Sequence, residues 1–552
     1  LLYGVTGSGK TEVYISLIEK VIERGFQAIV LIPEIALTYQ TLMRFYRHFG
    51  DRVSVMNSTL SPGEKYDQMQ RARNGDIDII IGPRSALFTP FEKPGIIIID
   101  EEHESTYKNE NAPRYHSREV AVKLAEMNGG IVVMGSATPS VESYDKAQRQ
   151  IYQLYTLDQR AAGSQLPEVE IIDLREEISC GNRSIFSRKL QAAIEDRLKK
   201  QEQIILFINR RAYQSFVSCR SCGEAVKCPH CDVSLKYHKN GKLICHYCGY
   251  EMPMVSRCPV CGSPYIGTFG AGTQKVEEEA ERFFPKASIL RMDMDTTREK
   301  DAHEKILSAF ANQEADILIG TQMIVKGHDF PNVTLVGILA ADISLFSGSY
   351  LSAERTFQLL TQAAGRAGRG SKKGHVLIQT YSPDNYAVQL GAAQDYERFY
   401  QHEMSYRKLL GYPPCMNMLG ILTASEDELL LDQICQVLNQ LLEQVISRRA
   451  SLIKIGPTKA PIAKIQDKYR KIIYLKSPSY EDLTMVKDAV ETYLNDHSDN
   501  RVQITFDFSM NTGGNEHGYK NDSGIRRCDP SETVQTRSGN NAPYTGTDRR
   551  YD

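Results

Sequence analysis

Short apolar runs rich in isoleucine and valine alternate with amphipathic stretches through the first part of the chain. The apolar runs that we predict to be strands are 28–32, 77–81, 96–100 and 131–134. Amphipathic segments such as 12–23 and 117–127 lie between them and are predicted to be helices. Near-continuous apolar strands separated by helices are typical of a parallel sheet that is covered on both faces. Residues 1–158 are therefore predicted to form one α/β lobe.

The same alternation returns further along the chain and predicts a second α/β lobe. Its predicted strands are 203–208, 288–292, 316–319, 334–339 and 375–379. A cysteine-rich stretch interrupts this lobe where its first strand and helix are expected to have ended. We therefore assign 159–218 to a linker and the start of the second lobe, 219–262 to an insertion, and 263–394 to the remainder of the lobe.

From residue 395 the pattern changes to a mixed α+β sequence. A long helix is expected near 426–448 and a strand at 471–475, so 395–508 is predicted to be a C-terminal domain. The last segment, 509–552, is rich in Asn, Gly, Ser, Thr and Arg and has almost no apolar periodicity. Such a composition cannot bury enough apolar surface to fold, so we predict a disordered or non-native tail.

Length and charge limit the possible classes of protein. The chain has 552 residues, which is enough for about three or four domains of roughly 100–200 residues each. Its net charge is −2, so a nucleic-acid partner would have to be bound by local charge. No run of about 18 or more uncharged apolar residues occurs, so no membrane partner is predicted. The opening residues, Leu1–Gly4, resemble the end of a strand rather than a signal peptide, and we expect an N-terminal region to be missing.

The segment 4–11 has the spacing of a phosphate-binding loop, Gly-x4-Gly-Lys-Thr, between a predicted strand and a predicted helix. Its backbone amides can hold phosphate oxygens, while Lys10 can reach the β- and γ-phosphates and Thr11 can bind Mg²⁺. We therefore predict ATP and Mg²⁺ as ligands; the alternative is an ordinary Gly-rich turn. The residues predicted to contact the nucleotide are Gly4, Val5, Thr6, Gly7, Ser8, Gly9, Lys10 and Thr11.

An acidic run, Asp100-Glu101-Glu102-His103, follows directly after four isoleucines. Carboxylates at the carboxyl end of a buried strand suit a metal ion and a water molecule. Asp100 is predicted to bind Mg²⁺ through its hydration shell, and Glu101 to orient and deprotonate the attacking water. Taken alone, the run could also be the solvated start of a helix.

Two arginines, Arg366 and Arg369, lie three residues apart, and each follows a glycine. On a helix this spacing puts both guanidinium groups on one face. There they can neutralise charge that develops on the γ-phosphate from across a cleft between the lobes. Hydrolysis would then depend on closure of the two lobes. The alternative is a basic surface helix.

Four Cys-x-x-Cys pairs lie within the insertion and supply eight thiolates, the number that two zinc ions need. Five residues separate the first pair from the second, which is tight for closing one site, whereas thirteen residues separate the second pair from the third. We therefore predict an inner site from the second and third pairs and an outer site from the first and fourth; disulfides are the alternative. The predicted ligands are Cys219, Cys222, Cys228, Cys231, Cys245, Cys248, Cys258 and Cys261.

The insertion is also locally basic and aromatic. Between Cys219 and Cys261 there are six Lys or Arg residues against three acidic residues, and Tyr237, Tyr247 and Tyr250 accompany them. A basic surface with exposed aromatic rings can hold DNA or a partner protein.

Eight short motifs follow one another in a recognisable order. They are 4–11 (GVTGSGKT), 31–38 (LIPEIALT), 82–88 (GPRSALF), 100–103 (DEEH), 135–140 (GSATPS), 207–211 (FINRR), 320–330 (GTQMIVKGHDF) and 362–369 (QAAGRAGR). This order resembles that of superfamily 2 DExH helicases. With the cysteine insertion and 113–121 (PRYHSREVA), the chain resembles the bacterial primosomal replication-restart helicases over residues 1–508. Asn57 and Ala212 depart from the His and Gly that are usual in that family.

The resemblance implies an α/β fold with two RecA-like parallel-sheet lobes, a two-zinc insertion in the second lobe and a C-terminal α+β domain. It also implies roles for further residues in these motifs. Ser136 and Thr138 would couple the nucleotide state to the grip on DNA, and Gly327 and Asp329 would line the nucleotide side of the second lobe. The residues implied to lie in segments that face single-stranded DNA are Pro33, Glu34, Arg84 and Ser85.

An aromatic-rich loop that senses DNA is implied between Tyr107 and His116. The residue types fit this role, because Tyr107, Tyr115 and His116 can stack on bases while Lys108 and Arg114 can contact phosphates. The alternative is a solvated loop without a special role.

The resemblance implies an ATP-dependent 3′→5′ DNA helicase that remodels stalled or abandoned replication forks and promotes primosome assembly. The implied partners are forked and single-stranded DNA, primosome proteins, the loader of the replicative helicase and single-stranded-DNA-binding protein. The implied location is the cytoplasm, at the nucleoid. The family also has a fork-binding N-terminal region upstream. Two alternatives stay open: a DNA-binding assembly scaffold or translocase with little strand separation, and an RNA-directed or chromatin-type ATPase, which the cysteine insertion disfavours.

Overall fold

The computed structural model describes most of the chain. The described residues are 1–37, 39–111, 113–160, 167–208, 216–238, 241–268, 272–293, 296–297, 302–325, 330–368, 372–447, 451–497, 499 and 501–508, and they belong to one compact unit, Leu1–Gly514. The predicted tail, 509–552, and three predicted site residues, Gly327, Asp329 and Arg369, lie outside the described residues. No helix in the described ranges is long and apolar enough to cross a membrane.

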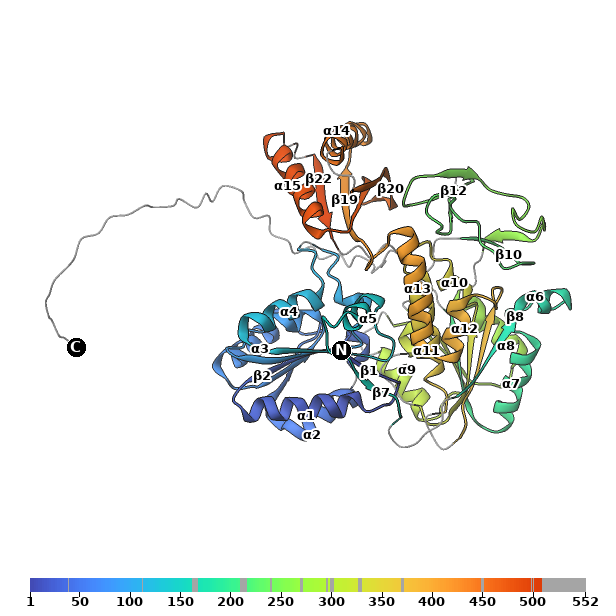
Figure 1. Cartoon of the computed structure of the whole chain (residues 1–552). Coiled ribbons are helices and arrows are strands. Elements are labelled where there is room, and N and C mark those ends of the chain that lie inside the picture. The colour runs from blue at the N-terminus through green and yellow to red at the C-terminus, as the bar shows by residue number, and fades with distance from the viewer. Residues whose placement is uncertain are drawn as a thin grey trace, which may run out of the picture. The chain divides into compact units, whose positions relative to one another are not determined.

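Seven parallel strands form the sheet of the first lobe, in the order β3-β4-β2-β5-β6-β1-β7 (Figure 1). They are β1 (Leu2–Gly4), β2 (Gln27–Leu31), β3 (Val53–Val55), β4 (Ile79–Gly82), β5 (Pro94–Asp100), β6 (Ile131–Ser136) and β7 (Tyr155–Leu157). Each apolar run predicted to be a strand in this lobe is a strand. The helices are α1 (Lys10–Glu23), α2 (Tyr39–Phe49), α3 (Pro62–Asn74), α4 (Ser117–Asn128) and α5 (Val141–Gln148).

Helices cover both faces of this sheet, as the continuous apolar strands predicted. Ile96 and Ile98 of β5 pack in one hydrophobic cluster with α1 and α2, whereas Ile97 and Ile99 pack in another with α3 and α4. Alternate side chains of one strand thus enter two cores, and all four are at most 1% exposed. This burial explains why the strand lacks the apolar–polar alternation of a half-exposed sheet.

The second lobe has a six-stranded parallel sheet in the order β15-β16-β9-β17-β18-β8. Its strands are β8 (Glu168–Asp173), β9 (Gln203–Ile208), β15 (Ile289–Met292), β16 (Ile317–Gly320), β17 (Val333–Leu339) and β18 (His375–Thr380). Its helices are α6 (Leu174–Ser179), α7 (Arg188–Lys199), α8 (Thr273–Phe283), α9 (Ala302–Ala311), α10 (Asp342–Leu345), α11 (Ser352–Ala364) and α12 (Tyr386–Ala393). The strand β8 was not predicted, so 203–208 is the second strand of the lobe and not the first.

The cysteine-rich insertion follows β9, which lies inside the second sheet between β16 and β17. It contains two small antiparallel sheets. One pairs β10 (Val217–Cys219) with β14 (Ile266–Thr268), and the other joins β11 (Lys236–Tyr237), β12 (Lys242–Ile244) and β13 (Glu251–Pro253).

The C-terminal domain begins with α13 (Tyr396–Leu410) and has a four-stranded antiparallel sheet in the order β20-β21-β19-β22. The strands are β19 (Asn417–Ser425), β20 (Ile453–Ile465), β21 (Lys468–Ser477) and β22 (Val502–Asp507). Two helices, α14 (Glu428–Ile446) and α15 (Tyr480–Asp496), pack on one face of this sheet. Side chains of the other face, among them Ile472 and Tyr474, pack with the cysteine-rich insertion.

Candidate active site

The predicted phosphate-binding loop connects β1 to α1, with Gly4 at the end of the strand and Lys10 and Thr11 at the start of the helix. Gly7 and Gly9 have φ of 81° and 87°, a left-handed conformation that favours glycine. The Lys10 ammonium donates a hydrogen bond to Gly4 O at 2.9 Å. The buried Ser8 Oγ makes no hydrogen bond with any described residue. A loop of this shape at a helix N-terminus fits phosphate oxygens.

Asp100 lies at the carboxyl end of β5, and β6 is the strand between it and β1. The Tyr14 hydroxyl donates to Asp100 Oδ1 at 2.9 Å, which ties α1 to the acidic run. Burial raises the pKa of Asp100 to about 6, the Glu101 carboxylate adds to this rise, and Lys10 opposes it. The structure therefore places Asp100 within the electrostatic reach of Lys10.

Glu101 has the left-handed φ of 47°, which is uncommon for a residue with a side chain. Its buried Oε2 makes no hydrogen bond to the described part of the chain. Backbone strain and a buried carboxylate oxygen without a hydrogen bond are each found at functional sites. Both observations fit the water-orienting role predicted for Glu101.

His103 connects the two lobes. Gln362 Nε2 of the second lobe lies 2.7 Å from His103 Nε2, and His103 Nδ1 lies 2.7 Å from Ser136 Oγ. Because an amide nitrogen only donates, Nε2 of the histidine accepts, and its proton lies on Nδ1 facing Ser136. The Ser136 hydroxyl in turn accepts a hydrogen bond from Thr138 N at 2.9 Å. Sequence reasoning assigned no role to His103 or Gln362, although both belong to quoted motifs.

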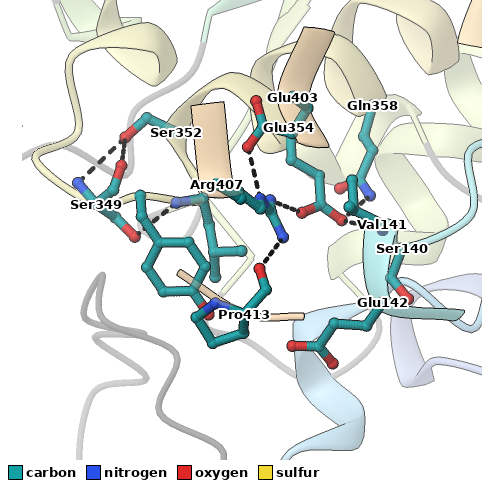
Figure 2. A network of polar contacts seen from close by, with 12 residues as sticks. Ser140, Val141, Glu142, Ser349, Ser352, Glu354, Gln358, Glu403, Arg407 and Pro413 are labelled. Carbon is teal, nitrogen blue, oxygen red and sulfur yellow. Dashed lines mark hydrogen bonds and ion pairs between the residues drawn. The ribbon is translucent and has the colours of Figure 1, made fainter. Parts of the chain in front are cut away.

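One face of α11 lies along the first lobe (Figure 2). Three residues spaced four apart, Glu354, Gln358 and Gln362, share this face. Glu354 Oε1 accepts from the first amide of α5 at 3.0 Å, and Gln358 Nε2 donates to Thr138 O at 3.4 Å. Beyond the helix, a Cβ added to Gly365 would lie 3.1 Å from Thr6 Oγ1 of the phosphate-binding loop.

Arg366 lies two residues past the end of α11, next to Gly365, and is buried. Burial lowers the pKa of Arg366 to about 10, and the Glu101 carboxylate opposes that shift. The two groups, one from each lobe, therefore interact electrostatically, and the arginine-finger role of Arg366 stays a prediction. Its predicted companion, Arg369, is not among the described residues.

The residues predicted to face DNA on the first lobe have different surroundings. Pro33 is buried and Glu34 is exposed, with Glu34 Oε1 accepting from Ser58 N at 2.9 Å. Arg84, in the 3-10 turn Arg84–Phe88, uses Nη1 to donate to Thr106 O at 3.1 Å and to Lys108 O at 2.9 Å. Arg84 therefore supports the backbone of the predicted aromatic-rich loop.

The stacking role predicted for Tyr107 and His116 is wrong, because both rings are buried. Tyr107 is 1% exposed, and its hydroxyl donates to Asp100 O at 2.7 Å and to Leu31 O at 2.9 Å. His116 Nδ1 accepts from Arg118 N at 3.3 Å at the start of α4, and burial lowers the pKa of His116 well below its usual range. Both side chains therefore stabilise the conformation of the loop.

The phosphate contact predicted for Lys108 is also wrong in this structure. Its side chain is fully buried and pairs with Asp507 of β22 at 2.7 Å. Arg114, which is partly buried, has Nη1 3.6 Å from the other oxygen of the same carboxylate. The loop of the first lobe is thus joined to the C-terminal domain by ion pairs.

Tyr115 keeps a partly exposed ring beside Phe88, an aromatic residue that sequence reasoning did not select. The two ring centres are 5.4 Å apart with planes at 89°, and Phe88 is 54% exposed. An exposed ring at this place can stack on a base. The signal was present in the motif 82–88, whose aromatic end was not weighed.

The eight clustered cysteines form two groups with the predicted inner and outer pairing. One group contains Cys219, Cys222, Cys258 and Cys261, and the other contains Cys228, Cys231, Cys245 and Cys248, with the sulfur atoms of each group within 4.8 Å of one another. Four thiolates at such distances fit a tetrahedral zinc ion and leave no position open for a substrate. The two groups therefore suit structural zinc sites.

The two sulfur clusters lie against different parts of the protein. Beside the outer cluster, Gly223 contacts the second lobe so closely that an added Cβ would lie 1.9 Å from Tyr381 O, and Arg220 lies 4.9 Å from the Tyr381 ring centre. Beside the inner cluster, Tyr247 packs 5.3 Å from Tyr474 of the C-terminal domain. The insertion therefore bridges the second lobe and the C-terminal domain.

Comparisons with protein families match four parts of the chain. The DEAD/DEAH box helicase model matches 1–147, and the helicase conserved C-terminal domain model matches 268–371. The PriA DNA helicase Cys-rich region (CRR) domain model matches 228–253, and the primosomal protein N C-terminal domain model matches 408–509. Two parallel-sheet lobes with a phosphate-binding loop at their junction, matched by both helicase models, define the class as two-lobe RecA-like helicase folds.

The chain belongs to the replication restart protein PriA family. The PriA protein of Bacillus subtilis (strain 168) is 49% identical over 512 residues, which are 92% of this chain and 63% of that protein. The PriA protein of Rickettsia felis is 37% identical over 472 residues, which are 85% of this chain and 72% of that protein. The chain spans about three fifths of the Bacillus relative's length.

Solved helicase structures share a limited likeness with the chain. RecG bound to a three-way DNA junction has a TM-score of 0.41 and 15% identity, covering 74% of this chain and 47% of that one. The DUF1998 helicase MrfA bound to DNA has a TM-score of 0.42 and 16% identity, covering 72% of this chain and 48% of that one.

Proposed function

We propose that this chain is the motor of an ATP-dependent DNA helicase. The observation that carries the proposal is the convergence of the two lobes on one cleft. Gly365 lies against Thr6 of the phosphate-binding loop, and Arg366 interacts with Glu101. A site assembled from both lobes makes hydrolysis depend on their relative movement, which is what a motor needs.

The residues present fit ATP and Mg²⁺. The loop amides and Lys10 would hold the phosphates, and Thr11 and Asp100 would hold Mg²⁺, which supplies positive charge to the phosphate oxygens. Glu101 takes the proton of the attacking water as the new bond to the γ-phosphorus forms and the bond to the bridging oxygen breaks. Arg366 and Arg369 neutralise the charge that develops, and Gly327 and Asp329 would line the second lobe's side of the nucleotide.

We propose that Ser136 and Thr138 couple the nucleotide cleft to DNA. His103 hydrogen-bonds both Ser136 and Gln362, and Gln358 donates to the carbonyl of Thr138. A change of lobe position would alter these contacts together. Arg84, Arg114 and Tyr115, with the adjacent Phe88, would form the surface that holds single-stranded DNA.

The biological role follows from the family. The relatives are named replication restart proteins, and we infer that this chain acts on stalled or abandoned forks, moves 3′→5′ and promotes primosome assembly and reloading of the replicative helicase. Its partners would be primosome proteins, the helicase loader and single-stranded-DNA-binding protein, in the cytoplasm at the nucleoid. Two zinc ions in the cysteine clusters would stiffen the insertion.

An unwinding assay on a synthetic fork tests the proposal, alongside ATP hydrolysis with and without DNA. The expected result is a displaced strand and DNA-stimulated hydrolysis, both abolished by Lys10→Ala, with polarity read from forks that carry only one single-stranded arm. DNA-stimulated hydrolysis without a displaced strand would instead support a translocase or assembly scaffold. Absence of ATP hydrolysis in the wild-type chain would contradict the proposal.

A further inference from the structure

Arg407 of α13 lies at the centre of a buried polar network (Figure 2). None of its side chain is exposed. Its Nη2 donates to Glu354 Oε2 at 2.5 Å, its Nε to Glu403 Oε1 at 2.8 Å and its Nη1 to Pro413 O at 2.9 Å. The guanidinium carbon also lies 5.3 Å from the ring centre of Tyr350. The planar fork of an arginine is therefore used in several directions at once.

The network keeps its charge although it is buried. Burial alone lowers the pKa of Arg407, but Glu354 and Glu403 together raise it above the usual range. Buried ion pairs usually add little stability compared with apolar residues of similar size, because each ion loses its hydration. A cluster of one cation and two carboxylates is therefore better explained by the geometry that it enforces than by the stability that it adds.

The geometry that the cluster enforces concerns the contact between the lobes. Glu354 Oε2 accepts a hydrogen bond from Arg407, while Glu354 Oε1 accepts one from the backbone amide of Val141 at 3.0 Å. Val141 is the first residue of α5 and follows the motif 135–140 of the first lobe. One carboxylate thus joins the C-terminal domain, the second lobe and the first lobe.

The position of Glu354 on α11 extends this effect toward the nucleotide. Glu354 begins the face that continues through Gln358 and Gln362 to Arg366. A helix of this length behaves as a rigid rod, so fixing its Glu354 end against α5 also fixes where its other end meets the phosphate-binding loop. Without Arg407, Glu354 would be a buried carboxylate without this ion pair, and its side chain would be held less firmly.

We propose that Arg407 is a positioning residue for ATP hydrolysis: it holds Glu354 so that α11 presents Arg366 to the nucleotide. The inference rests on the proposed function of the cleft. It makes α13 part of the motor, because a displacement of the C-terminal domain reaches the nucleotide site through two side chains. The effect acts through α11, and Arg407 itself touches no reacting atom.

The test is Arg407→Lys, which keeps the charge but cannot reproduce the fork of donors. Its matched control is Arg398→Met on the same helix, because Arg398 has 69% of its side chain exposed and its ion pair with Asp395, at 3.8 Å, is not buried. Nucleotide-binding sites are first counted by titration with a fluorescent ADP, so that kcat refers to folded sites. We expect Arg407→Lys to lower kcat for DNA-stimulated hydrolysis about tenfold and to change KM for ATP less than about twofold, because the phosphate-binding loop is intact.

A second measurement does not depend on activity. Hydrogen exchange at the Val141 amide, in nucleotide-free protein, should be about tenfold faster in Arg407→Lys than in wild type, because Glu354 no longer holds that amide firmly. A wild-type kcat per counted site, or unchanged exchange at Val141, would overturn the inference even if the variant melts earlier. Absence of ATP hydrolysis in the wild-type chain would instead overturn the proposed function. The exchange rate at the Val141 amide would still decide whether Arg407 holds α11 against α5.

Discussion

Gly365 faces Thr6 across the cleft, and a Cβ at position 365 would lie 3.1 Å from the threonine hydroxyl oxygen. The backbone φ of Gly365 is −63°, which any residue can adopt. The close approach of Thr6 therefore favours glycine at this position, whereas the backbone conformation does not.

Gly365→Ala should therefore impair hydrolysis without unfolding the protein. The added methyl pushes the end of α11 away from Thr6, so we expect kcat/KM for ATP to fall about tenfold. The control is Gly63→Ala on α3, where the nearest atom to the new Cβ is 4.0 Å away. That change should stabilise the helix by about 0.5–1 kcal/mol and leave hydrolysis unchanged. A wild-type kcat/KM in Gly365→Ala would show that Gly365 and Thr6 are further apart during ATP hydrolysis than they are in this structure.

The exposed pair Phe88 and Tyr115 should contribute to DNA binding, whereas the buried Tyr107 should not. Phe88→Ala or Tyr115→Ala is expected to weaken single-stranded DNA binding by about 1–3 kcal/mol, the usual value of one base stacked on a ring. Tyr107→Phe removes a hydroxyl that bonds two backbone carbonyls, so it should cost about 1 kcal/mol of stability and leave affinity unchanged. Fluorescence anisotropy and thermal unfolding separate the two effects; a loss of affinity in Tyr107→Phe would restore the stacking role.

Loss of either zinc site should harm fork processing more than basal hydrolysis. Cys261→Ser disturbs the outer site and Cys248→Ser the inner one, and each variant should lower the zinc content from about two ions per chain to about one. We expect little change in basal ATP hydrolysis, because the sulfur clusters belong to a separate insertion, but a strong loss of unwinding. Metal analysis and the two assays check this, and an equal loss of both activities would argue against it.

Lys236 should make stability depend on pH. Burial lowers the pKa of Lys236 from 10.5 to about 7, so between these values the unfolded chain binds the proton that the folded chain has lost. Stability therefore rises with pH across this window and is lowest, for this group, below pH 7. Lys236→Met removes the group, so its melting temperature should exceed that of wild type at pH 7 and the gap should narrow toward pH 10. A gap that does not change with pH would contradict the assignment.

The pairing of Lys108 with Asp507 should be costly to break. Asp507→Asn leaves a fully buried ammonium facing a neutral amide, which should destabilise the protein by about 3 kcal/mol or more. The control is Asp467→Asn, because Asp467 is 92% exposed and its pair with Lys464 lies at the surface. That change should cost less than about 1 kcal/mol. Urea unfolding of both variants provides the comparison.

The local features of the fold were predictable because they depend on neighbours in sequence. Fully buried strands such as β5 can be recognised as apolar runs. The pairing of the Cys-x-x-Cys pairs follows from the number of residues that lie between them. The edge strand β8 was missed because it alternates acidic and apolar residues, Glu168-Val169-Glu170, and has one neighbouring strand. Its pairing is fixed by β18, more than 200 residues away in sequence.

The features that sequence reasoning missed depend on tertiary contacts. Tyr107 and His116 have the residue types of a stacking loop. Nothing near them in sequence shows that the Tyr107 hydroxyl hydrogen-bonds the carbonyl oxygens of Leu31 and Asp100. Likewise, His103 and Gln362 are 259 residues apart, so their contact follows only from the packing of the two lobes. Periodicity predicts which face of an element is buried, but not which polar group a buried side chain will contact.

The ion pair between Lys108 and Asp507 also has a practical consequence for dissecting the molecule. Asp507 is the final residue of β22, yet its carboxylate neutralises a lysine of the first lobe. Removing the C-terminal domain would therefore also remove the counterion of the buried Lys108 in the first lobe. A shortened protein that keeps this ion pair therefore has to include β22.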